Sequence, residues 1–172
     1  MIEGMDELKK RLGQLRNIDL KVPTAVAVMR IQNDAKNNVP VRTGELRGSI
    51  FTSVRETEDG IEGICYTNKS YAPYVEFGTG PAGEESHKGI SPDVPVAYRQ
   101  TGWIIPANAM SEEEAEEYGF PVARDSSGKV IGYYTRGQPA RPYMYPAYAN
   151  NKEKVKDDYC RYLQKRMENI SK

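Results

Sequence analysis

The chain has 172 residues, a length that predicts one domain able to bury a hydrophobic core without disulfides or a structural metal. Its 24 lysines and arginines equal its 24 aspartates and glutamates, so it lacks the basic excess typical of free nucleic-acid binders. Cys65 and Cys160 form no C-x-x-C motif, which excludes a zinc ribbon or a thioredoxin-like redox site, and charges interrupt every apolar run, which predicts no membrane span.

The first 38 residues predict two helices with a bend between them. Apolar residues recur at steps of three and four along the first helix, expected over about 3–16: Ile2, Met5, Leu8, Leu12 and Leu15. The second helix is expected over about 20–37 and tolerates Pro23 in its first turn. It ends where Asn37 and Asn38 precede Pro40, since proline disfavours helical backbone in the residue before it.

From Gly44 the apolar residues alternate, which predicts a β-hairpin over residues 44–67. Its strands are expected over "LRGSIFTSVRE" and "IEGICYT", joined by the turn signal "TEDG". The stretch "YAPYVEFGTG", Tyr71–Gly80, then predicts a turn of helix that ends at Gly78.

Residues 81–138 predict a long irregular insertion, because glycines and prolines interrupt a polar segment. Within it, "GWIIPA" predicts a short buried strand or anchor, and residues 112–118 predict a surface helix with a capping box formed by Ser111 and Glu114. Residues 129–135 predict a strand added to the sheet of the hairpin. A long C-terminal helix is expected over about 142–170, with Pro146 in its first turn and one apolar side.

The residues that usually carry chemistry form no recognisable active site. The single histidine, His87, lies in a polar loop, and Cys65 lies between apolar residues of a strand, where an inert buried thiol is expected. The acids of residues 112–117 spread around a helix, and "GTGPAG" lacks the lysine of a phosphate-binding loop. We therefore expect no catalytic residue, no metal site and no cofactor.

Two further interpretations stay open from the residues alone. Glu45 and Glu76 would form the carboxylate pair of a small hydrolase or nuclease if the fold brought them together, although ion pairs with arginines would also explain them. Arg136 and Arg141 lie among tyrosines in "TRGQPARPY", a composition found both in nucleic-acid contacts and in protein interfaces. A DNA-contacting adaptor is thus an alternative, and zero net charge favours a protein partner.

Three motifs stand in order along the chain: "VPVRTGELRGSI", "YAPYVEFGTG" and "QPARPYMYPAY". This order resembles the head–tail joining and tail-completion (neck) proteins of long-tailed bacteriophages, a family of minor tail components. The matching positions are Pro40, Val41, Thr43, Gly44, Leu46, Arg47, Ser49 and Ile50, then Tyr71, Ala72, Tyr74, Val75, Glu76, Phe77, Gly78 and Thr79, then Pro139, Ala140, Arg141, Pro142, Pro146 and Ala147. Tyr143 replaces the more usual phenylalanine, and the segment from about Pro81 to Gln138 is longer than the minimal family pattern.

The resemblance implies an α+β fold, in which a small antiparallel sheet is packed by the N-terminal helical segment and the long C-terminal helix. It implies a structural virion protein, not an enzyme, that is made in the host bacterial cytoplasm and assembles as a ring in the phage neck or tail. Expected partners are further copies of the chain and the connector, adaptor, tail-tube or tail-terminator proteins. DNA is expected only as a passenger in the lumen of the ring.

The resemblance also suggests roles for residues of the motifs. Glycines at 44, 78 and 80 permit turns that bulkier residues resist. Tyr74 and Phe77 are expected to anchor packing, and Glu76 is expected to pair with Arg47 or Arg141. The residues expected at interfaces or motif corners are Arg42, Thr43, Gly44, Glu45, Leu46, Arg47, Tyr71, Tyr74, Glu76, Phe77, Gly78, Thr79, Arg136, Arg141, Pro142 and Tyr143.

Overall fold

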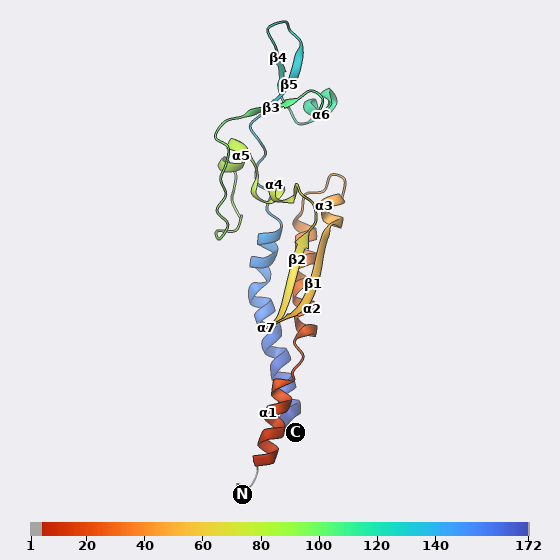
Figure 1. Ribbon diagram of the computed structural model, residues 1–172, viewed down its shortest axis with the longest axis vertical. Helices are drawn as coiled ribbons and strands as arrows, with labels where there is room; N and C mark the ends of the chain where they lie inside the picture. Colours follow the sequence, from red (N-terminus) through yellow and green to blue (C-terminus); the bar gives the residue numbers. More distant parts are fainter. Residues whose placement is uncertain (1–4, 172) are drawn as a thin grey trace. The chain divides into compact units, whose positions relative to one another are not determined.

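The computed structural model describes residues 5–171 and divides the chain into two compact units (Figure 1). The first unit holds the chain up to Asn68 and from Pro146 onward, and the second holds Lys69–Tyr145. Helices dominate and the strands form two small antiparallel sheets, which confirms the α+β prediction.

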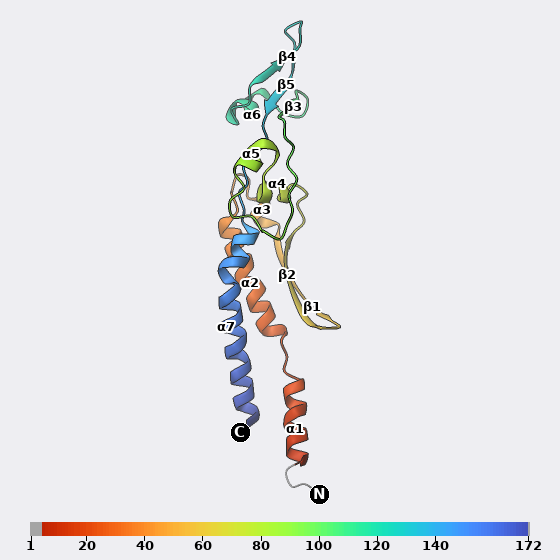
Figure 2. The ribbon, with the colours of Figure 1, turned by 90° about the vertical axis from the view of Figure 1, so that its left-hand side faces the viewer.

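The first unit is built around the helix α2, Lys21–Asn38, preceded by α1, Met5–Arg16. Figure 2 shows the hairpin of β1, Ile50–Thr57, and β2, Gly60–Thr67, on one side of α2, and the helix α7, Met144–Ser171, on the other. The expected helix over 3–16 and the second over 20–37 are therefore found, with residues 3 and 4 outside the described chain.

The hairpin packs on α2 closely enough that glycine is required at one position. A Cβ at Gly63 would lie 2.5 Å from Cγ1 of Val28 and 2.7 Å from Cγ2 of Thr24. Ile50 is fully buried on this inner face, and the Gln32 amide donates to its carbonyl oxygen at 2.7 Å. The register pairs Phe51 with Tyr66, and both side chains are exposed on the outer face.

Polar pairs join α2 to α7. The side chain of Asn151, which is 1% exposed, donates to the Asp34 carboxylate and, at 2.8 Å, to the Ala147 carbonyl oxygen. Arg30 forms an ion pair with Asp158 at 2.7 Å. Hydrogen bonds with fixed geometry thus align the two helices along their length.

The predicted first strand begins too early. Residues 46–48 belong to a single helical turn, α3, Glu45–Gly48, and β1 starts only at Ile50. Gly44 takes a positive φ of 80°, and the Gly48 N–H donates to its carbonyl oxygen at 2.9 Å. Four residues are too few to show a helical period, so alternation at Leu46, Gly48 and Ile50 imitates a strand.

The second unit holds five short elements before a final strand. They are α4, Ala72–Phe77; α5, Gly80–Glu85; β3, Trp103–Pro106; α6, Glu112–Glu117; and β4, Val122–Arg124. The last is β5, Val130–Thr135. The turn of helix expected before Gly78 and the capping box of Ser111 and Glu114 are both present, whereas α5 and β4 were not predicted.

The strand predicted over 129–135 exists, but the prediction that it joins the hairpin sheet is wrong. It is the central strand of a separate sheet with the order β3-β5-β4. Gly132 permits this pairing, since a Cβ there would lie 2.1 Å from the Ile105 carbonyl oxygen. The strand β3 was expected to be buried, yet Ile104 is exposed and Trp103 half-buried.

Candidate functional site

The second and third motifs meet within the second unit, where they form a feature called here the corner: residues 71–80 together with residues 136–145. Several hydrogen bonds join the two segments, and three of them involve the backbone of Gln138 or Arg141. The Thr79 N–H donates to the Gln138 carbonyl oxygen at 2.9 Å, and the Gln138 N–H donates to Thr79 Oγ1 at 3.1 Å. The Arg141 N–H donates to the Val75 carbonyl oxygen at 2.8 Å. Motifs that lie 60 residues apart in the sequence therefore act as one structure.

Glu76 is the centre of the corner. Its side chain is buried, with the residue 6% exposed, and its carboxylate accepts three backbone N–H groups. Tyr143 donates at 2.7 Å and Met144 at 2.9 Å to Oε2, and Tyr145 donates at 3.0 Å to Oε1. Because the first N–H groups of a helix have no partner within it, this carboxylate caps the start of α7 from a distant part of the chain.

This geometry corrects the expected ion pair of Glu76 with Arg47 or Arg141. Both carboxylate oxygens are engaged by main-chain donors, and burial leaves little room for a guanidinium. Arg141 contributes its backbone N–H to the corner, and its side chain is exposed. Arg136 forms an ion pair with Glu85.

Glycines allow the two segments of the corner to approach. Gly78 has a φ of 74°, and a Cβ there would lie 2.6 Å from the Ala140 nitrogen. Gly137 has a φ of 91°, and a Cβ there would lie 2.0 Å from the Thr79 carbonyl oxygen. Larger residues at either position would push the segments apart.

The aromatic residues of the corner divide into buried and exposed sets. Tyr143 is 1% exposed, whereas Tyr71 and Tyr74 are exposed, Tyr74 to 58%. The prediction that Tyr74 anchors packing is therefore wrong, while Phe77 is half-buried. The Phe77 carbonyl oxygen accepts the hydroxyl of Tyr98 at 2.8 Å, and burial raises the pKa of that hydroxyl. Exposed tyrosines on a rigid support are typical of protein-binding surfaces.

The first motif belongs to the other unit. Its backbone turns at Gly44, where the Thr43 hydroxyl accepts the Glu45 N–H at 3.4 Å, and Leu46 fills the core. Arg42 and Arg47 are exposed.

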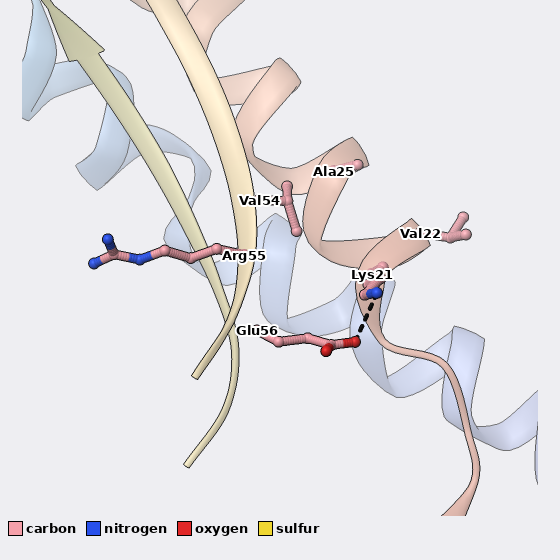
Figure 3. Close-up of a pocket in the computed structure, with 6 residues that line it drawn as sticks. All are labelled: Lys21, Val22, Ala25, Val54, Arg55 and Glu56. Atoms are coloured by element: carbon pink, nitrogen blue, oxygen red, sulfur yellow. Dashed lines mark ion pairs between the residues drawn. The ribbon is translucent and has the colours of Figure 1, made fainter. Parts of the chain in front are cut away.

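The first unit also contains a shallow groove of about 410 Å³ between α2 and β1 (Figure 3). It is lined by Lys21, Val22, Ala25, Val54, Arg55 and Glu56. Figure 3 shows Lys21 and Glu56 joined by an ion pair, which measures 2.6 Å, and the hydrogen bond and charge of Glu56 raise the pKa of Lys21. The groove is open and largely apolar, which suits contact with another polypeptide more than capture of a small ligand.

Groups that could carry chemistry are dispersed. Within residues 5–171, no three histidine, cysteine or acidic side chains gather as metal ligands would. Cys65 is half-buried in β2, and burial raises the pKa of its thiol, which lowers its reactivity. His87 is exposed and stacks on Tyr98. No helix of the described chain is long and apolar enough to cross a membrane.

Sequence reasoning missed the residues that tie the motifs together. Gln138 donates from its side chain to the Tyr74 carbonyl oxygen at 2.7 Å and bonds Thr79 through its backbone. Its place just before "PARP" was the only available signal. Asn151 had no signal at all, because an asparagine in a charged helix is normally expected at the surface.

Comparison with family models gives a match over residues 1–78 to the family described as "Bacteriophage HK97-gp10, putative tail-component". The match includes the whole first motif and the second motif as far as Gly78. It confirms the resemblance to a bacteriophage tail-component family. The chain matches no curated protein and no solved structure.

Proposed function

From this similarity to phage tail components, we propose that the protein is a structural part of the virion that joins head to tail or completes the tail. Copies assemble as a closed ring in the neck or at the tail end, and DNA passes through the lumen. The corner and the apolar surfaces of the first unit provide contacts to sister subunits and to neighbouring connector, tail-tube or terminator proteins.

The observation that carries this proposal is the role of Glu76 in the corner. Both carboxylate oxygens of Glu76, the acid of the second motif, accept hydrogen bonds from three backbone N–H groups. The side chain therefore has a structural role, which is to fix the backbone of residues 143–145. A carboxylate used in hydrolysis must instead reach a substrate or a metal-bound water. The hydrolase or nuclease alternative thus loses one of its two proposed carboxylates.

The distribution of exposed side chains supports contact with other proteins. Tyr71 and Tyr74 project from the corner, and apolar residues of α1, α2 and the hairpin are exposed on the first unit. Arg136, proposed above as a DNA contact, is engaged by Glu85. Exposed apolar surfaces of this kind are expected of a subunit that buries them against neighbouring proteins when it assembles.

Deletion of the gene from the phage or prophage that encodes it tests the proposal. Electron micrographs of lysates should then show DNA-filled heads and separate tails, and the wild-type protein supplied in trans should restore joined particles. Tyr74→Ser should fold normally but complement poorly, whereas Tyr118→Ser, which changes an exposed tyrosine outside the motifs, should complement. Infectious, joined particles from the deletion phage would contradict the proposal.

A further inference from the structure

The helix α1 has an apolar side that no other residue among 5–171 buries. Its stripe recurs at the 3-4-3 spacing of a two-helix seam and consists of Met5, Leu8, Leu12 and Leu15. Leu8 and Leu12 are more than half exposed, and none of the helix's described residues is buried. Figure 2 shows α1 standing apart from both the hairpin and α7. A helix of 12 residues is marginal in water without tertiary packing, so the stripe requires a partner.

The charges beside the stripe indicate what this partner is like. On the helix surface, the residues that flank the apolar seam are Lys9, Arg11 and Arg16, of which Arg11 is paired with Glu7 of the same helix at 2.9 Å. Two α1 helices from different copies, paired in either direction, would bring these bases together, and like charges across a seam are unfavourable. The partner surface should therefore be apolar with an acidic border.

The hairpin of the same chain offers such a surface, apolar in the middle and acidic at its border. Its outer face exposes Phe51 and Tyr66, whose rings lie 6.0 Å apart, next to the half-buried Ile64. Its tip, residues 55–62, holds four acids against one arginine, and two of these acids are ion-paired, Glu56 with Lys21 and Glu62 with Arg55. Glu58 and Asp59 occupy the turn itself.

The dimensions of the two surfaces also agree. A 12-residue helix is about 18 Å long. From Phe51 to Thr57 the strand advances about 20 Å. With the C-terminal end of α1 toward the tip, Arg16 would face Glu58 and Asp59 while the leucines cover the aromatic pair.

Docking of α1 on its own hairpin is opposed by the linker that follows it. The Asp19 carbonyl oxygen accepts the hydroxyl of Tyr162 at 2.7 Å, which ties the linker to α7. The hairpin covers the opposite side of α2 (Figure 2). The hairpin that α1 can reach most readily is thus that of a second copy.

We propose that α1 of one copy docks on the outer face of the β1–β2 hairpin of the next copy. Because the two surfaces differ, the contact is heterologous, and repetition of such a contact closes a ring when the rotation between subunits permits it. This inference rests on the proposed function and names the surface that links the subunits.

The test uses the full-length chain in analytical ultracentrifugation at increasing concentration. The wild-type protein should self-associate, and Leu12→Ser or Phe51→Ser should each weaken association by about tenfold or more. Both residues are exposed in the single chain, so at a concentration low enough that all proteins are monomers, the circular dichroism and melting temperature of each variant should match those of the wild type. The matched control is Met167→Ser, which removes an equally exposed apolar side chain from α7.

Mixing separates a heterologous contact from a symmetric one. The Leu12→Ser protein keeps an intact hairpin and the Phe51→Ser protein keeps an intact α1, so an equimolar mixture should form dimers that neither variant forms alone. Arg16→Glu should also weaken association, and adding Glu58→Arg and Asp59→Arg in the same chain should restore it.

A wild-type protein that stays monomeric at every concentration would overturn the proposed contact, because α1 would then be covered within its own chain or by another protein. Self-association that is unchanged in both single variants would overturn it as well. The proposed function is tested separately, by whether the deletion phage produces joined particles.

Discussion

The buried carboxylate of Glu76 gives the most quantitative prediction. Replacing it with alanine removes three charge-assisted hydrogen bonds, one to the buried Tyr143 N–H and two to the partly buried N–H groups of Met144 and Tyr145. A lost bond that leaves a buried donor unpaired costs about 2 kcal/mol, and one that water can partly replace costs about 1 kcal/mol. Glu76→Ala should therefore destabilise the fold by about 4 kcal/mol.

Glu76→Gln keeps the shape of the side chain and one acceptor oxygen, but it loses the charge and turns an N–H donor toward the start of α7. We expect a cost of about 2 kcal/mol, half that of alanine. The control Glu116→Gln, on the exposed side of α6, should stay within about 0.5 kcal/mol of the wild type.

Urea unfolding followed by fluorescence measures these costs where they arise. Trp103 is the single tryptophan, and it lies in the same unit as Glu76. With a denaturant slope of about 2 kcal/mol/M, the midpoint should fall by about 1 M for glutamine and about 2 M for alanine. A Glu76→Gln midpoint equal to that of Glu116→Gln would refute the reasoning, because the carboxylate would then not hold the corner.

Three further predictions concern the first unit. Asn151→Ala should lower stability by about 2 kcal/mol in urea unfolding followed by circular dichroism, since it removes the side-chain donor of the buried Asn151 from the partly buried Asp34 carboxylate. Asn150→Ala, which changes the exposed neighbour, should be nearly neutral, and equal effects of the two substitutions would contradict the polar contact between α2 and α7. Gly63→Ala should lower the free energy of unfolding by about 1–3 kcal/mol because its Cβ would press on Val28. Gly48→Ala, with nothing within 4 Å of its Cβ, should be tolerated. If Gly63→Ala were equally well tolerated, the hairpin would not pack closely on α2. Iodoacetamide at pH 8 should modify the exposed Cys160 well before Cys65, because burial raises the thiol pKa of Cys65 and leaves less thiolate there. Peptide mass spectrometry at successive times measures the order, and faster modification of Cys65 would contradict its burial.

The elements that could be predicted from the sequence are those whose signals are local. The capping box of α6 needs only Ser111 and Glu114, three residues apart, and both of its hydrogen bonds are present. The hairpin was found because alternation continues through Ile50–Thr57 and through the return strand. The long apolar period of α2 likewise outweighed the proline in its first turn.

The features that could not be predicted depend on contacts between distant residues. Residues 129–135 show strand character, but nothing in them says that their partner is β3 and not the hairpin. From the sequence, Glu76 was expected to form an ion pair with an arginine. In the structure its carboxylate instead accepts three backbone N–H groups, those of Tyr143, Met144 and Tyr145. Every residue except proline has a backbone N–H, so the sequence does not indicate which of these groups lacks a partner. That Glu76 caps the start of α7, 67 residues further along the chain, therefore cannot be predicted from local sequence.

The resemblance carried by the motifs is confirmed over residues 1–78, although the roles expected of Glu76 and Tyr74 were wrong. Tyr74 was expected inside and is 58% exposed, while Tyr143 is fully buried. Both are tyrosines beside prolines, and composition alone cannot distinguish a ring that fills the core from one offered to a neighbour.

Electron cryomicroscopy of the intact virion tests the central proposal most directly. We expect density for several copies of this chain in a closed ring around the DNA path at the neck or tail end, with α1 of each copy on the hairpin of the next. Virions that lack the chain altogether, or that carry it as isolated copies away from the DNA path, would contradict it.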